Sequence, residues 1–231
     1  SLREAIMAAN FDSSYGGCVG TTGPDTILLE TETYTLSDDL PNITSEIVIK
    51  GNGPESTIIE ASECNPITLP DSCEPVAYRI FIVTSSGSLT LENLTLQHGN
   101  ITNYHGGAIV NHGFLELLNC QLTGNMAENG GGALMNEPDA VANIIDSMFI
   151  ANETDVGDGG GINNQGILTL SNSEISENRS KFGGGGIFNN YKGEIIIEHS
   201  TISGNDSIEW TGGGIDNDNE LTITNSDISD N

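Results

Sequence analysis

A repeat of 26 or 27 residues occupies the second half of the chain. Five copies run from residue 106 to residue 231, and each opens on glycines, reaches one asparagine and closes on a second asparagine. The second asparagines follow one another at intervals of 27, 26, 27 and 26 residues. A fixed period in this range indicates structural units that stack on one another. The repeat therefore points to a solenoid before any other feature is considered.

The pattern within one repeat indicates short strands. Segments such as LTL (168–170) alternate apolar with polar residues, and glycine or asparagine interrupts them every few positions. No apolar stripe recurs at helical spacing, and the period is too short for a propeller blade. Short strands separated by tight bends suit a coil that rises by one strand spacing per turn. We therefore predict an all-β fold, a right-handed parallel β-helix (β-solenoid) of about 26 residues per coil.

Equivalent residues of successive coils lie above one another in such a stack. Asparagine tolerates the left-handed backbone conformation of a bend, and its amide can bond the asparagines above and below. We also expect a serine column of Ser147, Ser173, Ser200 and Ser226, with Cys120 and Leu94 at the equivalent places. The two expected asparagine columns are Asn111, Asn136, Asn164, Asn189 and Asn217, and Asn125, Asn152, Asn178, Asn205 and Asn231.

We predict a single β-helix domain over residues 1–231. Residues 1–25 form its N-terminal helix and cap, because Leu2, Ile6 and Ala9 of the first ten residues share one helical face. Such a helix covers the exposed edge of the first coil. Residues 26–105 form less regular early coils that include a cysteine loop (62–78), and residues 106–231 form the five regular repeats.

The charge balance is strongly acidic. Lys and Arg number 6 against 33 Asp and Glu, which gives a formal net charge of −27. Such a surface repels nucleic acid and anionic membranes, so neither is an expected partner. No apolar run approaches the roughly 18 residues of a membrane helix, so we expect no membrane insertion. Calcium and cationic surfaces remain compatible with this charge.

Four cysteines point to an oxidising environment. Cys64 and Cys73 lie in a proline-rich loop that a disulfide would close, and we expect that bridge. Cys18 and Cys120 form a second pair, unless Cys120 is a buried small residue of the serine column. The chain begins at Ser1 without methionine, which suggests a processed N-terminus. We therefore expect an extracellular or cell-surface protein.

Two sets of motifs resemble known families. SLREAI (1–6) followed by GPDTI (23–27) resembles the N-terminus of secreted β-helix proteins with a CSLREA-type motif, although the cysteine before the serine is absent here. The repeats are similar to those of the polymorphic outer-membrane protein family, which pairs a GGA[ILV] motif with FxxN. FxxN survives literally once, at Phe149–Asn152. The resemblance implies a β-helix on the cell surface, with scaffolding or adhesion as its function, and implies no conserved chemistry.

Catalysis is the main alternative, because pectin-processing enzymes use the same fold. A polysaccharide lyase needs an acidic calcium cluster and an Arg or Lys that takes the proton beside the uronate. Arg79 opens a candidate strand, but no acidic trio recurs beside it at coil spacing. Carboxylate pairs roughly 5–10 Å apart, as glycosidases need, arise by chance between neighbouring coils. We therefore assign no catalytic residue, and a fold analogy cannot supply one.

Some residues are candidates for binding or modification. Asp216, Asp218 and Glu220 alternate and could present oxygens to calcium, the only cofactor we consider, and an acidic solvated turn is the alternative. Of the N-x-[ST] sequons, Asn100 is the expected glycosylation site because it lies in a predicted loop. The four histidines show no metal spacing, and we place them on the surface.

These features favour a non-enzymatic extracellular structural or adhesive β-helix protein. One form of this hypothesis is a subunit that assembles head-to-tail into a surface filament, so that its partner is a copy of itself. The other expected partners are surface proteins or glycans. The alternatives are a pectate lyase-like polysaccharide-processing enzyme or carbohydrate-binding module, and a passenger fragment of a larger surface protein.

Overall fold

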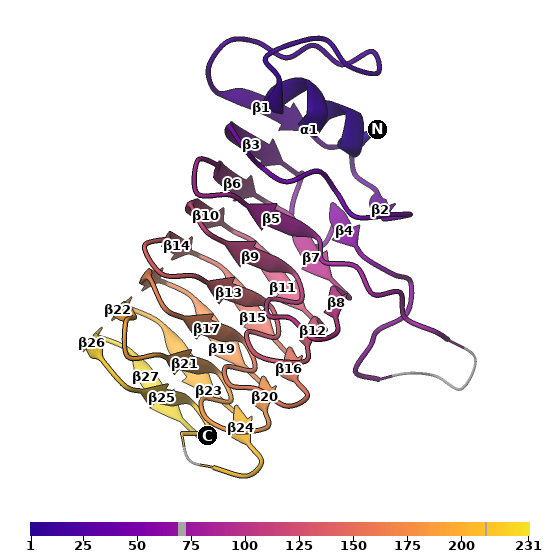
Figure 1. Ribbon diagram of the computed structural model, residues 1–231. Helices are drawn as coiled ribbons and strands as arrows, with labels where there is room; N and C mark the ends of the chain where they lie inside the picture. Colours follow the sequence, from indigo (N-terminus) through magenta and orange to yellow (C-terminus); the bar gives the residue numbers. More distant parts are fainter. Residues whose placement is uncertain (69–72, 211) are drawn as a thin grey trace.

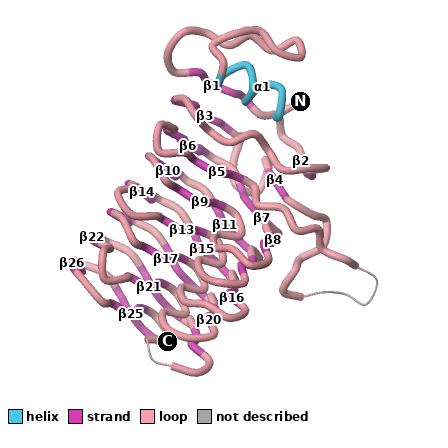
Figure 2. The backbone as a smooth tube through the Cα atoms, in the orientation of Figure 1, coloured by secondary structure: helices cyan, strands magenta, loops and turns pink. Residues whose placement is uncertain are grey.

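The computed structural model describes residues 1–68, 73–210 and 212–231, and it shows a stack of about eight coils with one short helix at its N-terminal end (Figures 1 and 2). Every pairing between neighbouring strands of the stack is parallel. Equivalent strands of neighbouring regular coils lie 26 or 27 residues apart, as Leu115, Ala142 and Leu168 do. The predicted all-β parallel β-helix is therefore confirmed.

Two sheets run the whole length of the stack. The first sheet contains β1 (Asp25–Leu28), β3 (Glu46–Lys50), β6 (Ser88–Glu92), β10 (Phe114–Leu118), β14 (Val141–Ile145), β18 (Ile167–Ser171), β22 (Glu194–Glu198) and β26 (Glu220–Thr224). The second sheet contains β2 (Thr33–Thr35), β4 (Ile58–Glu60), β7 (Thr95–Gln97), β11 (Gln121–Thr123), β15 (Met148–Ile150), β19 (Glu174–Ser176), β23 (Thr201–Ser203) and β27 (Asp227–Ser229).

Two shorter sheets complete the coils. The third sheet contains β8 (Asn100–Ile101), β12 (Met126–Ala127), β16 (Glu153–Thr154), β20 (Arg179–Ser180) and β24 (Asp206–Ser207). The fourth sheet contains β5 (Phe81–Val83), β9 (Ile109–Asn111), β13 (Leu134–Asn136), β17 (Ile162–Asn164), β21 (Ile187–Asn189) and β25 (Ile215–Asn217). Both begin later than the first two: the fully described segment between β2 and β3 contains no strand, and between β4 and β5 the chain leaves the stack (Figure 1).

Each coil buries its inward-facing side chains against the next coil. Inward positions of the first sheet (Leu89, Leu115) and of the second (Leu96, Leu122, Phe149) are fully buried. Burying one such side chain stabilises the fold by roughly 2 kcal/mol. The core is therefore a column of neighbour-to-neighbour contacts, and a modest apolar fraction is enough to fill it.

Helix α1 (Leu2–Asn10) covers the first coil, as the sequence pattern predicts. It starts with a capping box, in which the Ser1 hydroxyl accepts from Glu4 N and the Glu4 carboxylate accepts from the Ser1 ammonium. Leu2 and Ile6 are buried in the core, and the helix contacts β1 and β3. Asn10 then ties the helix to the stack, since its Nδ2 donates to Asn42 O at 2.7 Å.

The two asparagine columns are hydrogen-bonded ladders inside the stack. In the first ladder each Nδ2 donates to the Oδ1 of the next coil at 2.7–2.9 Å, from Asn111 to Asn217. In the second, the Oδ1 of each asparagine after Asn125 also accepts from the backbone N–H of the asparagine one coil earlier, as Asn152 Oδ1 does from Asn125 N at 3.0 Å. The first four asparagines of each ladder are buried. These amides satisfy buried polar groups of the backbone that aliphatic residues would leave unpaired.

The expected reason for the asparagines is wrong in one respect. None of the ladder asparagines adopts a left-handed backbone conformation. The residue before each member of the second ladder does so instead: Gly124, Ala151, Glu177, Gly204 and Asp230 have φ between +52° and +65°. Asparagine is therefore used here for its amide, and the bend belongs to its neighbour. The serine column has the same arrangement, because Asn119, Asp146, Asn172, His199 and Asn225 precede its members with positive φ.

Candidate functional site

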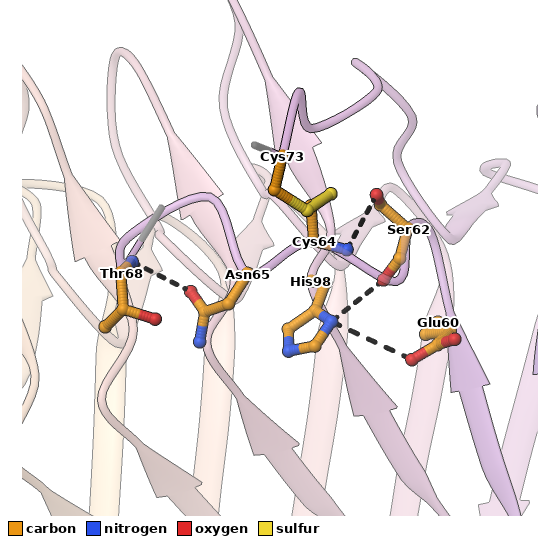
Figure 3. The surroundings of a disulfide bond; sticks show 7 residues. All are labelled: Glu60, Ser62, Cys64, Asn65, Thr68, Cys73 and His98. Atoms are coloured by element: carbon orange, nitrogen blue, oxygen red, sulfur yellow. Dashed lines mark hydrogen bonds and ion pairs between the residues drawn. A yellow bond between two sulfur atoms is a disulfide. The ribbon is translucent and has the colours of Figure 1, made fainter. Parts of the chain in front are cut away.

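A disulfide-closed loop leaves the stack between β4 and β5. Cys64 and Cys73 are bonded, with a Cα–Cα distance of 5.7 Å (Figure 3). Residues 69–72 of the predicted cysteine loop (62–78) lie outside the described part of the chain. At the base of the loop, Asn65 Oδ1 accepts from Ile67 N at 2.9 Å and Cys64 N donates to Ser62 Oγ at 3.0 Å. The loop therefore has a defined turn on its Cys64 side.

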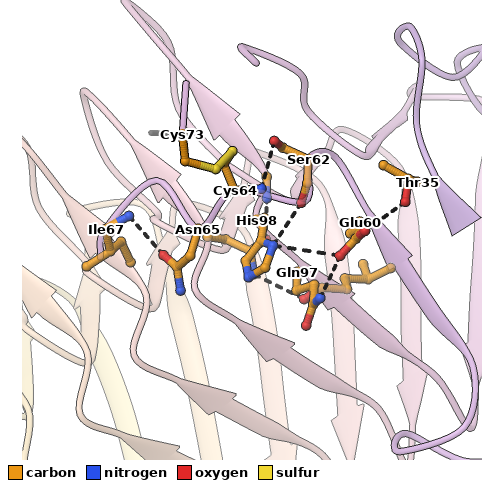
Figure 4. A network of polar contacts seen from close by, with 12 residues as sticks. Thr35, Glu60, Ser62, Cys64, Asn65, Ile67, Cys73, Gln97 and His98 are labelled. Carbon is orange, nitrogen blue, oxygen red and sulfur yellow. Dashed lines mark hydrogen bonds and ion pairs between the residues drawn. A yellow bond between two sulfur atoms is a disulfide. The ribbon is translucent and has the colours of Figure 1, made fainter. Parts of the chain in front are cut away.

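A polar network attaches this loop to the outer face of the second sheet (Figure 4). Glu60 ends β4 and is only 6% exposed. Its carboxylate accepts from Thr35 Oγ1 and from Gln97 Nε2, each at 2.7 Å. His98 Nδ1 lies 2.8 Å from Ser62 O, which can only accept, so this nitrogen carries the proton.

The Glu60–His98 pair combines the two groups that general acid–base chemistry uses. His98 Nδ1 lies 3.8 Å from Glu60 Oε2. Both carboxylate oxygens already accept hydrogen bonds from neighbouring strands, and the imidazole N–H is directed at the loop carbonyl. The arrangement therefore holds the loop on the sheet, as buried polar groups with complete partners do.

The placement of His98 on the surface is wrong, because it is largely buried in this network. The sequence signal for the network is the register of outward positions, in which Thr35, Glu60 and Gln97 are paired across β2, β4 and β7. Gln97 is 37 residues from Glu60, because the disulfide loop lengthens that coil. The regular period therefore cannot align the two residues.

The alternative second disulfide, Cys18 with Cys120, is wrong, since both are free thiols. β10, which precedes Cys120, lies three strand spacings from β1, which is about 14 Å along the stack. A disulfide requires Cα atoms within about 7 Å. Cys120 instead occupies the serine column, where its N–H donates to Ser147 Oγ at 3.0 Å. Burial raises the pKa of its thiol to about 12.

A small pocket of about 240 Å³ lies beside the first strands of the third and fourth sheets. Its lining includes Arg79, Tyr104, Asp39 and Asn42 together with aliphatic side chains. Arg79 Nε donates to Gly106 O and its Nη2 to His105 O, each at 2.8 Å. Burial lowers the pKa of Arg79, while the nearby Asp39 carboxylate acts in the opposite direction.

The acidic residues expected to bind calcium lie at the last described coil. Asp216 lies in β25, Asp218 follows that strand and Glu220 begins β26. Burial raises the pKa of Asp216, and Asp218 and Asp158 raise it further. Asp158 approaches from an earlier coil, where its Oδ1 accepts from Gly183 N at 2.8 Å. In the described ranges, no three acidic, His or Cys side chains are grouped around one point, so calcium at this turn stays a prediction.

The structure does not place Asn100 in a loop. It begins β8, is half-buried, and its N–H donates to Tyr78 O at 2.9 Å. The sequons at Asn152, Asn178 and Asn205 fall on the buried ladder, so these amides face the interior. Asn100 remains the predicted glycosylation site, on β8 at the edge of the third sheet.

The fold defines the class of this chain as a parallel β-solenoid built from a repeat of about 26 residues. Comparison with protein families, with curated proteins and with solved structures finds no match to the chain. The one helix in the described part of the chain is too short to cross a membrane.

Proposed function

We propose that the chain is a non-enzymatic extracellular β-helix protein that acts as a structural or adhesive element. The disulfide between Cys64 and Cys73 carries this proposal, because disulfides form and persist in oxidising compartments such as the cell exterior. The Glu60–His98 network fixes the closed loop to the stack, so the loop projects from a rigid support. The resemblance of the N-terminus and repeats to secreted and polymorphic outer-membrane β-helix proteins supports the same setting.

The stack favours lateral contact with a large partner. Its first and second sheets each contain eight strands in register, which gives extended outer faces. With a net charge of −27, such a face suits glycans, cationic surface proteins or contacts that cations screen. Nucleic acid and the membrane interior are not partners in this proposal.

Head-to-tail assembly is one form of the proposal. In the last described coil, the core-facing Ile223 and Ile228 are 40% and 43% exposed, whereas their counterparts Ile197 and Ile202 are fully buried. A second copy would bury these side chains, and so would further coils if the chain is a passenger segment of a longer surface protein. Because α1 covers the other end, the second copy would meet a helix and not a free strand edge.

Electron microscopy of the purified protein, with calcium and then with a chelator, tests the assembly. Regular filaments support the head-to-tail form, and their loss on chelation would make Asp216, Asp218 and Glu220 the first residues to mutate. Single short rods in both conditions contradict that form. Labelling of intact producing cells with an antibody tests the location, and finding the protein only inside, with Cys64 and Cys73 reduced, would overturn the proposal as a whole.

The Arg79 pocket supports a carbohydrate-binding module as a second candidate. Release of new reducing ends or unsaturated products from polysaccharides would instead establish the enzyme alternative.

A further inference from the structure

Arg79 differs from four other cationic side chains, which lie in ion pairs. Arg3, Lys50, Arg179 and Lys181 each pair with a carboxylate of a neighbouring element. Arg79 is partly buried beside a pocket, and none of the ion pairs within residues 1–68, 73–210 and 212–231 includes it. Buried charges in proteins are normally paired, because desolvation without a counter-charge is costly. The pocket therefore offers a place where a bound anion would pair with Arg79.

The guanidinium retains an edge for such an anion. Its Nε and Nη2 form one edge of the planar group, and this edge donates to two consecutive main-chain carbonyls, His105 O and Gly106 O. These bonds fix the plane of the side chain. The other edge, made by Nη1 and the second Nη2 proton, has no bond to the described residues. Two parallel N–H groups at such an edge match the geometry of a carboxylate.

The remaining walls suit a sugar ring. Leu40, Ile82 and Ile101 line the pocket with partly exposed apolar side chains, and Tyr104 is 63% exposed at the rim. Asp39 and Asn42 add an acceptor carboxylate and a side-chain amide. A volume of about 240 Å³ lies below the range of roughly 300–1,000 Å³ for drug-sized ligands, so the pocket suits a single ring.

We propose that this pocket binds a carboxylate-bearing saccharide unit, such as a uronate ring of an acidic glycan. The sugar carboxylate accepts from the free edge of Arg79, and the apolar face of the ring packs against Tyr104, Ile82 and Ile101. Ring hydroxyls donate to Asp39 and exchange hydrogen bonds with Asn42. This assignment names a ligand class for the adhesive function proposed above, and in that respect it rests on that proposal.

A saccharide fits this chemistry better than a peptide carboxylate. The Asp39 carboxylate lies close enough to Arg79 to influence its pKa, so it would repel a ligand that offers only an anion. Sugar hydroxyls convert the same carboxylate into an acceptor of hydrogen bonds. The exposed ring of Tyr104 provides a flat apolar surface that a simple carboxylate would not use.

Saturation-transfer NMR and calorimetry with small probes test the site in the intact chain. The probes are glucuronate and galacturonate, their neutral methyl esters, and acetate, all at about 0.15 M salt so that the net charge is screened. We expect saturation transfer to one of the uronates, and binding at least about tenfold weaker for its ester and for acetate. Equal binding of acid and ester, equal binding of acetate, or no binding of either uronate would overturn the proposal.

Variants then locate the site. Arg79→Lys keeps the charge and loses the fork, so we expect about tenfold weaker uronate binding. Because Arg79 also holds two carbonyls, Tyr104→Ala provides a second variant at an exposed position, and we expect several-fold weaker binding from it. Tyr191→Ala is the matched control, since Tyr191 is 66% exposed and does not line the pocket. Unchanged affinity in both pocket variants would contradict the assignment.

The two proposals fail in distinguishable ways. If uronate binds at Arg79 but the protein forms no filaments, is not on the cell surface and binds no surface, the site is supported and the adhesive function is rejected. Adhesion or filaments with no uronate binding would reject only this site.

Discussion

Gly124 and Gly204 provide a matched pair for testing whether the disulfide loop packs on the stack. Both precede an asparagine of the second ladder, with φ of +61° and +65°. An added Cβ at Gly124 would lie 2.8 Å from Asn65 Nδ2 and 3.3 Å from His98 Cδ2, whereas at Gly204 the nearest atoms lie at 3.9 Å. Substitution by alanine therefore imposes the same backbone strain at both sites and a loop contact at only one.

The expected magnitudes follow from this difference. Left-handed alanine costs about 1 kcal/mol relative to glycine, and Ala151 shows that the column accommodates it at φ +52°. Overpacking adds roughly 1–3 kcal/mol where the neighbour cannot move away. We expect Gly204→Ala to lower the free energy of unfolding by about 1 kcal/mol, and Gly124→Ala by about 2–3 kcal/mol.

Urea unfolding measures these differences, and hydrogen exchange at Ile67 and Thr68 reports the loop itself. We expect faster exchange there in Gly124→Ala alone. Combining each glycine variant with Asn65→Ala gives a double-mutant cycle, in which coupling of about 1 kcal/mol is expected with Gly124 and none with Gly204. Equal destabilisation by the two alanines, with unchanged loop exchange and no coupling, would refute the packing of Asn65 on Gly124.

Three further predictions concern the ladders, the acidic turn and the thiols. Asn178→Ala leaves buried donors and acceptors of neighbouring coils without partners, so thermal or urea unfolding should show a loss of about 3 kcal/mol. The control, Asn225→Ala, is at an exposed position and should cost only about 1 kcal/mol, because alanine adopts its positive φ less readily than asparagine does. The raised pKa of Asp216 means that the folded state binds its proton more tightly than the unfolded state, so the associated stability is present below about pH 3.8 and is lost as pH rises through the folded pKa. Asp216→Asn should therefore raise the melting temperature at pH 7 without calcium. A calcium-induced rise in melting temperature that is seen only in the wild type would identify this turn as the calcium site. A variant less stable than the wild type at pH 7 in chelator would contradict the repulsion of Asp216 by Asp218 and Asp158. Iodoacetamide at pH 8 should alkylate Cys18 and leave Cys120 unmodified in the folded protein, because burial blocks access to the Cys120 thiol and raises its pKa to about 12. Peptide mass analysis measures the labelling, and equal labelling of the two thiols would contradict the burial of Cys120.

The regular half of the chain could be predicted from its sequence because its period is almost constant. Once Asn125 and Asn152 are aligned, the strands, the inward positions and the serine column follow at fixed offsets. The helix is equally visible, since Ser1 and Glu4 form its capping box and its apolar face is regular. These features depend only on local pattern and repetition.

The candidate sites could not be predicted because they depend on the irregular coils. Glu60 and Gln97 are neighbours across β4 and β7, but the disulfide loop between them adds residues to that coil. The repeat period therefore cannot predict that they pair. Arg79 bonds to carbonyls one coil further along, but the repeats hold glycine at its equivalent positions, Gly107 and Gly132, so repetition gives no signal for it. The left-handed bend was assigned to the wrong residue because several residue types, including Ala151 and Glu177, adopt it.

The asparagine ladders also give the stack a direction. In both ladders the side-chain amide of each coil donates toward the C-terminal neighbour and accepts from the N-terminal one, and the backbone N–H groups of the serine column point the same way. Bond dipoles aligned head to tail polarise one another, so each column of hydrogen bonds is polar, with a donor end and an acceptor end. A further coil at the C-terminal face would continue the ladders by presenting an asparagine Oδ1 as an acceptor, as Asn231 does to Asn205. Because the ladders begin at Asn111 and Asn125 and helix α1 covers the N-terminal end, only the C-terminal end of the rod carries this polarity, and the two ends are not interchangeable.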